Sequence, residues 1–113
     1  MSQITTHILD TSVGMPARNV PVGLQNFSNG QWHDIGAGVT NSDGRIEGLV
    51  VSETPLDAGI YKLRFDTASY YTEQKISFFY PFVDIVFEIS GDGQHYHVPL
   101  LLNPYGYSTY RGS

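Results

Sequence analysis

Short runs of alternating apolar and polar residues, separated by Gly, Pro and Asn, constrain the fold of this chain more than any other feature. An alternation of period two is typical of half-buried β-strands, and Asn-Gly or Asp-Gly pairs between such runs are typical of tight turns. The first run, Ile4 to Leu9, carries His7 in the middle of one face. Further strands are predicted over residues 20–27, 31–40, 60–66 and 82–90, from His95 onward, and as an edge strand over residues 105–111.

Two turn sequences indicate where the chain reverses. Asn29-Gly30 favours a two-residue hairpin between the second and third predicted strands. The sequence NSDG at residues 41–44 predicts another turn, because Asp-Gly tolerates positive φ, and it places Arg45 directly after that turn. Residues 68–75 lack Gly and Pro and predict one short helix. Seven or eight short strands with at most one helix favour an antiparallel β-sandwich, with a barrel as the alternative.

Composition limits the partners that this chain is expected to have. A length of 113 residues suits one domain, residues 1–113. The net charge is −5 and the six Lys and Arg are scattered, so no basic patch for nucleic acid or an anionic membrane is predicted. The charged fraction is only 15%, which predicts that other subunits cover part of the surface. The chain has no cysteine, so neither disulfides nor thiolate chemistry can contribute.

The N-terminal residues indicate where in the cell the protein is expected. Met1 is followed by SQITTHILD, which lacks the basic and apolar segments of a signal peptide. No apolar run approaches the roughly 20 residues of a membrane span. We therefore expect a soluble cytoplasmic protein.

The side chains that could carry chemistry are few. They are His7, His33, His95, His97 and Arg45, together with the C-terminal segment. Strand alternation places His95 and His97 on the same face. An H-x-H pair can bind zinc, but a structural zinc site needs four ligands and the chain has no cysteine, so no metal is predicted.

Each of these residues, taken alone, has an ordinary structural interpretation. His7 is explained as a polar residue on a solvent-facing strand, and Arg45 as a surface charge that contributes little to stability. The last four residues, Tyr-Arg-Gly-Ser, are explained as a tail. However, aromatic residues continue almost to the end of the chain, which is unusual for a loose terminus. No single residue identifies an active site.

Three separated segments together resemble a known family. They are THILDTSVGMPARNVPVGL at residues 6–24, TNSDGRI at residues 40–46 and HYHVPLLLNPYGYSTYRGS at residues 95–113. In this order they are similar to the transthyretin-related 5-hydroxyisourate hydrolases, in which a terminal Tyr-Arg-Gly-Ser distinguishes the enzymes from hormone-carrying transthyretins. Asn103, where many relatives have Ser, is a departure beside the motif.

The resemblance implies a fold, an assembly and a site. The fold is a transthyretin-like sandwich of two four-stranded sheets, assembled as a homotetramer, a dimer of dimers, with a central channel. The implied catalytic residues are His7, Arg45, His97 and Ser113, and the implied substrate-binding residues are His7, Arg45 and Tyr110. No cofactor and no metal are implied. Because strand alternation separates Arg111 from Tyr110, we expect Arg111 to anchor the tail.

The resemblance also implies a reaction in urate degradation. It is hydrolysis of 5-hydroxyisourate to 2-oxo-4-hydroxy-4-carboxy-5-ureidoimidazoline, by histidine-assisted attack of water on a cyclic amide bond. Either His7 or His97 can be the base that activates the water. The alternatives are a non-catalytic carrier of a small ligand with the same fold, and a purely structural sandwich module. His7, His97 and the terminal tetrapeptide argue against a carrier, which has no need for titratable groups at its pocket. The polar histidine on the first strand, the aromatic-rich terminus and the lack of a secretion signal argue against a structural module.

Overall fold

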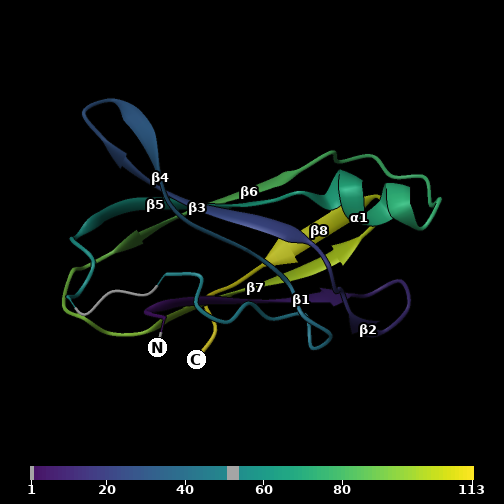
Figure 1. Ribbon diagram of the computed structural model, residues 1–113, viewed down its shortest axis with the longest axis horizontal. Coiled ribbons are helices and arrows are strands. Elements are labelled where there is room, and N and C mark those ends of the chain that lie inside the picture. The colour runs from purple at the N-terminus through teal and green to yellow at the C-terminus, as the bar shows by residue number, and fades with distance from the viewer. Residues whose placement is uncertain (1, 51–53) are drawn as a thin grey trace.

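The computed structural model describes residues 2–50 and 54–113. Within these residues two four-stranded sheets form the two layers of a sandwich, with one helix at one end (Figure 1). This confirms the predicted fold class. Sheet A has the strand order β2-β1-β7-β8 and sheet B the order β4-β3-β5-β6. The strands are β1 (Ile4–Asp10), β2 (Met15–Pro16), β3 (Pro21–Ser28), β4 (Gln31–Val39), β5 (Gly59–Phe65), β6 (Val83–Ile89), β7 (Tyr96–Asn103) and β8 (Gly106–Thr109).

Two features of sheet A were not predicted. Among the paired strands of the described residues, only β1 and β7 run parallel, with Ile4 opposite Tyr96 and Asp10 opposite Leu102. Alternation shows which face a side chain occupies but not the direction of the neighbouring strand, so the sequence could not indicate this pairing. The second feature is β2, whose two residues are too few to show any period.

The predicted turns form where the sequence places them. Asn29 and Gly30 both have positive φ, 54° and 74°, as a primed two-residue hairpin turn requires. Gly44 in the second turn has φ 72°. A Cβ on Gly44 would lie 2.5 Å from the carbonyl oxygen of Ile8, so only glycine allows this turn to pack against β1.

The core lies between the two sheets and is built by strand alternation. In β1, Ile4, Thr6, Ile8 and Asp10 are buried, whereas the intervening residues are half-buried on the outer face of sheet A. Fully buried apolar side chains from both sheets pack together; the largest include Ile4, Ile8, Leu24, Leu63, Phe65, Leu100 and Leu102. The outer face of β1 is therefore free to carry polar groups.

The helix α1 (Thr67–Glu73) covers one end of the sandwich (Figure 1). It begins one residue earlier than expected because the Asp66 carboxylate accepts a hydrogen bond from the Ser69 N–H at 3.1 Å and caps the first turn. Its buried residues are Thr67, Tyr70 and Tyr71. In the described part of the chain, no helix has the length and apolar character needed to cross a membrane.

A buried hydrogen bond ties α1 to sheet A. The Tyr70 hydroxyl donates to Asp10 Oδ2 at 2.8 Å, and Asp10, at the end of β1, is 1% exposed. Burial and then this hydrogen bond raise the pKa of Tyr70 to about 12, so the hydroxyl keeps its proton. The neighbouring Tyr71 hydroxyl is also buried but has no hydrogen-bond partner among the described residues.

The two tyrosines give a matched stability test. Tyr70→Phe removes the hydrogen bond and leaves a buried oxygen of Asp10 without that donor, so we expect the free energy of unfolding to fall by about 2 kcal/mol. Tyr71→Phe removes no hydrogen bond and should leave it unchanged or slightly higher. Urea unfolding of both variants measures the difference. Equal destabilisation would contradict the assigned role of the Asp10–Tyr70 bond.

Candidate active site

The site begins with the parallel pairing of β1 and β7. In this register Thr5 lies opposite His97, and His7 lies opposite Pro99. The buried residues of both strands point toward the core, so His7 and His97 share the outer face of sheet A. Both imidazoles are half-buried. Two residues far apart in the sequence are thus fixed by adjacent strands.

The turn at residues 41–44 brings Arg45 to the same face. The Asn41 side-chain oxygen accepts hydrogen bonds from the N–H groups of Asp43, at 2.9 Å, and Arg45, at 3.1 Å. The turn then docks on β1, because the Ile8 N–H donates to the Gly44 carbonyl at 2.9 Å. Arg45 forms an isolated antiparallel bridge with His7. The local sequence NSDGR therefore places a guanidinium beside the first histidine.

The C-terminal tail reaches the second histidine. β8 pairs with β7 antiparallel, with Leu100 opposite Thr109, and the pairing resumes where Gly112 lies opposite His97. The Gly112 N–H donates to the His97 carbonyl at 2.8 Å. A Cβ on Gly112 would lie 2.6 Å from Cδ2 of His97, so the backbone rests directly against the imidazole. The tail is held in place, as its aromatic residues indicated.

A hollow with a volume of about 710 Å³ opens at this place. It combines side chains from β1, the turn, the start of β7 and the tail, and so brings together several of the predicted site residues. His7 borders this region through its bridge to Arg45 rather than through the wall of the hollow itself. The lining residues are Thr5, Thr6, Asn41, Asp43, Arg45, Ile46, Glu47, His95, His97 and Ser113.

The environment holds both imidazoles toward their neutral form. Burial lowers the pKa of His97, and the positive charge of Arg45, then His95 and His7, lowers it further, whereas a backbone hydrogen bond with Thr5 opposes this shift. Burial and then Arg45 also lower the pKa of His7, against a backbone hydrogen bond and the charge of Asp43. A neutral imidazole has an unprotonated nitrogen, so each can accept a proton near neutral pH.

Two residues of the tail, Tyr110 and Arg111, lie away from the hollow. Tyr110 is 58% exposed and borders a separate hollow beside residues 85–88 of β6, away from the histidines. Arg111 donates to Gln94 Oε1 at 2.8 Å, and its guanidinium lies 4.8 Å from the ring centroid of Tyr96, a core-facing residue. Arg111 thus anchors the tail as expected. Ser113 lies at the hollow, but Tyr110 is not brought to it by this chain alone.

The remaining histidines have different surroundings. His33 in β4 is exposed, and its Nε2 lies 3.2 Å from the Ser28 carbonyl, outside the site. His95 stacks on His97, with ring centroids 6.4 Å apart. Nowhere in residues 2–50 and 54–113 do three or more His, Cys, Asp or Glu side chains converge in a way that could hold a metal.

Thr5 also belongs to the site, although the sequence did not indicate it. Its Oγ1 lies 2.9 Å from His95 Nε2 and 2.8 Å from His97 Nδ1. A threonine two residues before His7 on the same strand face is a signal that could have indicated it, because residues i and i+2 of a strand point to the same side.

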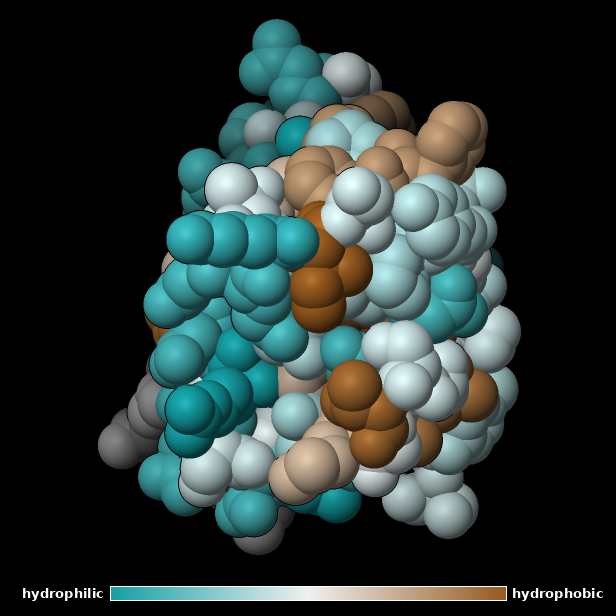
Figure 2. Space-filling model, turned by 90° about the vertical axis from the view of Figure 1, so that its right-hand side faces the viewer, coloured by the Kyte–Doolittle hydropathy of each residue, from teal (hydrophilic) through white to brown (hydrophobic). Residues whose placement is uncertain are grey.

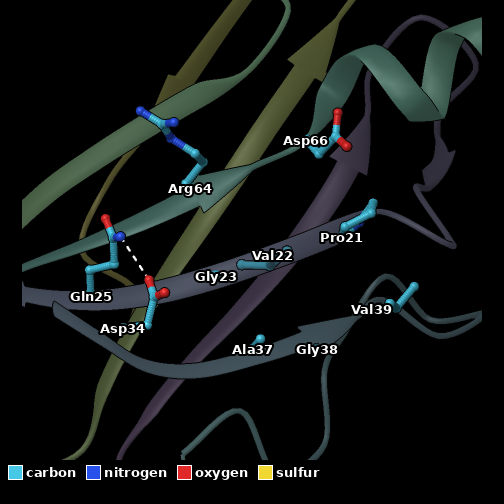
Figure 3. A pocket seen from close by; sticks show the side chains of 10 residues that line it. All are labelled: Pro21, Val22, Gly23, Gln25, Asp34, Ala37, Gly38, Val39, Arg64 and Asp66. Atoms are coloured by element: carbon cyan, nitrogen blue, oxygen red, sulfur yellow. Dashed lines mark hydrogen bonds between the residues drawn. The ribbon is translucent and has the colours of Figure 1, made fainter.

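A second hollow lies on the outer face of sheet B (Figure 3). Its floor is formed by small residues such as Gly23 and Ala37. The Gln25 side-chain amide donates a hydrogen bond to Asp34, and Asp66 caps α1. Arg64 donates from Nε and Nη2 to the two carboxylate oxygens of Asp84, at 2.6 Å and 2.7 Å. Because these polar groups already form hydrogen bonds with other residues of the chain, this hollow is a weaker candidate for catalysis than the histidine site.

Comparisons with known proteins identify the family and its fold. Residues 4–112 match the model of the HIUase/Transthyretin family. The chain is 44% identical over 114 residues to the 5-hydroxyisourate hydrolase of Mus musculus, covering 99% of this chain and 96% of that protein. The solved Klebsiella pneumoniae 5-hydroxyisourate hydrolase is 39% identical with a TM-score of 0.82, over 97% and 98% of the two chains. Sea bream transthyretin in complex with thyroxine is 33% identical with a TM-score of 0.91, over 98% and 95%.

The charge of Arg45 predicts how the site histidines titrate. In Arg45→Gln, the loss of a positive charge should raise the pKa of both His7 and His97, because that charge lowers both in the unaltered protein. Titration of the imidazole ring protons by NMR measures both pKa values, which should lie below 6.5 before the substitution. Lys75→Gln is the control, since it removes one positive charge from an exposed residue just after α1, away from the hollow. Unchanged titration in Arg45→Gln would contradict the assigned coupling.

Proposed function

This chain belongs to the HIUase/transthyretin family, and we propose that it hydrolyses 5-hydroxyisourate to 2-oxo-4-hydroxy-4-carboxy-5-ureidoimidazoline in urate degradation. Relatives that it matches along nearly its whole length are named 5-hydroxyisourate hydrolases. One observation supports the proposal most strongly. The imidazoles of His7 and His97, both with lowered pKa values, lie with Arg45 on the outer face of sheet A.

The histidines supply acid–base catalysis. Water attacks the carbonyl carbon of the cyclic amide, and one of His7 and His97 accepts the proton that the water loses. The other orients the water or protonates the ring nitrogen that leaves. Because burial and Arg45 keep both pKa values low, the basic form is available near neutral pH. Positioned proton transfer of this kind typically contributes about 10²–10⁴-fold in rate.

Arg45 and Ser113 bind the substrate and stabilise charge. A guanidinium presents a planar fork of N–H donors that suits a heterocycle rich in carbonyl groups. In the transition state the attacked carbonyl oxygen gains negative charge, which Arg45 is suited to stabilise. Ser113 lines the same hollow, one residue after Gly112 pairs with His97. Tyr110 completes substrate binding only if a neighbouring subunit brings it to the hollow.

A non-catalytic carrier is the alternative, and the fold does not separate the two functions, since a transthyretin is among the similar structures. The polar side chains of the site distinguish the two functions. A carrier needs a shaped pocket but gains nothing from imidazoles held ready to accept protons, so the electrostatics of His7 and His97 favour the hydrolase.

We propose that the protein is a homotetramer formed as a dimer of dimers. β6 and β8 are each an edge strand of their sheet, and they border a shared hollow. Exposed aromatic side chains lie just before β6 and in β8; Phe79, Tyr80, Phe82 and Tyr107 are 37–69% exposed, and the ring centroids of Tyr80 and Tyr107 are 5.3 Å apart. Figure 2 shows further apolar patches between polar side chains at the end that carries α1. Free edges with apolar neighbours favour association.

A direct assay tests the reaction. 5-Hydroxyisourate generated in situ from urate should lose its ultraviolet absorbance faster with the protein than without it. His7→Asn and His97→Asn should each lower the catalysed rate at least about 100-fold, because a proton acceptor is lost. His33→Asn, at an exposed histidine outside the site, is the matched control and should retain the full rate. Decay at the uncatalysed rate with the unaltered protein would refute the hydrolase proposal.

Light scattering tests the assembly. We expect a mass about four times the 12.6 kDa of one chain, both for the unaltered protein and for the two histidine variants, because neither imidazole lies at the free edges of the sheets. A mass equal to one chain would contradict the tetramer. In that case no neighbouring subunit would bring Tyr110 to the hollow.

A further inference from the structure

The Thr5 hydroxyl lies between two imidazoles. Its oxygen is 2.8 Å from His97 Nδ1 and 2.9 Å from His95 Nε2, and both distances are those of good hydrogen bonds. A hydroxyl has one proton to donate, so it can donate to only one of the two nitrogens and must accept from the other. The protonation of His95 is therefore coupled to that of His97.

Regular secondary structure positions the side chains of Thr5, His97 and His95. Thr5 lies directly opposite His97 in the parallel ladder of β1 and β7. The two imidazoles stack with an angle of 18° between their planes. His97 is half-buried, whereas His95, just before β7, is exposed to solvent. The three groups form a path from the interior of the hollow to water.

The two hydrogen bonds can run in either of two directions. If the Thr5 hydroxyl donated to Nδ1 of His97, the neutral ring would carry its proton on Nε2 and could not accept one there. The direction that leaves Nε2 free to accept has the proton on Nδ1 of His97. Nδ1–H then donates to Thr5, and the Thr5 hydroxyl donates to Nε2 of His95. This leaves Nε2 of His97 without a proton.

We propose that Thr5 is a positioning residue that fixes His97 as a base at Nε2 and connects it to His95 as a proton relay. The inference rests on the proposed hydrolase function. When Nε2 of His97 takes a proton from the attacking water, the Nδ1 proton moves to the Thr5 oxygen, and the Thr5 proton moves to Nε2 of His95. When His97 Nε2–H protonates the leaving nitrogen, both transfers reverse and the starting tautomers return. No proton is gained or lost over the cycle.

The surrounding charges favour the transfer of a proton from His97 to His95. A positive charge on His97 lies among groups that repel it, since Arg45 and His7 both disfavour its protonated form. Asp43 and Glu47 also line the hollow and partly offset the charge of Arg45. A proton on exposed His95 is hydrated instead. The relay thus moves the charge of the intermediate from a half-buried ring to one in contact with water.

A substrate-free experiment tests the tautomers. Nitrogen-15 NMR of the imidazoles should show His97 protonated at Nδ1 and not at Nε2, and His95 unprotonated at Nε2. In Thr5→Val, which keeps the shape and strand propensity of threonine but lacks the hydroxyl, both histidines should redistribute between tautomers. Thr5→Ser should retain the original pattern. Identical tautomers with and without the hydroxyl would overturn the coupling, whether or not the protein hydrolyses 5-hydroxyisourate.

Kinetics tests the relay itself. Thr5→Val and His95→Gln should each lower kcat about tenfold, the effect of one lost hydrogen bond, with KM unchanged. Because the two residues act in one path, the double variant should be no slower than either single variant. Thr5→Ser should restore most of kcat. Thr11→Val is the matched control, since it removes a hydroxyl bonded to the Leu102 carbonyl beyond the hollow.

The outcomes separate the relay from the function. If the unaltered protein is active and Thr5→Val has the same kcat, or if the losses in the two single variants add in the double variant, the relay is refuted and the hydrolase proposal stands. If the unaltered protein shows no activity, the hydrolase proposal fails, and the NMR pattern alone decides whether Thr5 couples the two histidines. His95→Gln changes an exposed residue, so it reports on the relay even if Thr5→Val fails to fold.

Discussion

The parallel pairing of β1 with β7 is the constraint on which the rest of the site depends. It sets Thr5 opposite His97 and His7 opposite Pro99, so the spacing of the two catalytic candidates is fixed by a strand register rather than by loops. The turn that carries Arg45 and the tail that carries Ser113 then dock on these two strands through one backbone hydrogen bond each, from Ile8 to Gly44 and from Gly112 to His97. A shift of either strand by one residue would turn that strand's own site residues, Thr5 and His7 of β1 or His97 of β7, toward the core.

Arg45 links the geometry of the site to its chemistry. As a donor it is suited to bind the substrate carbonyl groups, and as a charge it lowers the pKa of both neighbouring histidines. The same residue therefore favours the neutral form of both imidazoles, the form that can accept a proton. A lysine at this position would carry the charge but not the planar fork, so the two contributions can be separated by substitution.

The sequence alone predicts much of this structure and less of the site. Local patterns locate β1, β3 to β8, the short helix and the turns, because alternation and Asn-Gly or Asp-Gly pairs act over a few residues. They do not report strand direction, which is why the parallel pair was missed, nor a two-residue strand such as β2. The candidate residues came from the resemblance of three separated segments. Thr5 escaped because its importance arises only when β7 lies beside it.

Two glycines close the backbone over the imidazoles, Gly44 near His7 and Gly112 against His97. At both positions an added methyl group would collide within 2.6 Å, with a carbonyl at Gly44 and with the ring at Gly112. The backbone therefore helps to hold both candidate imidazoles, and at His97 it does so together with the Thr5 side chain. We expect new substrate preferences in proteins built this way to arise at lining residues that hold neither the rings nor the turn of Arg45, such as Glu47.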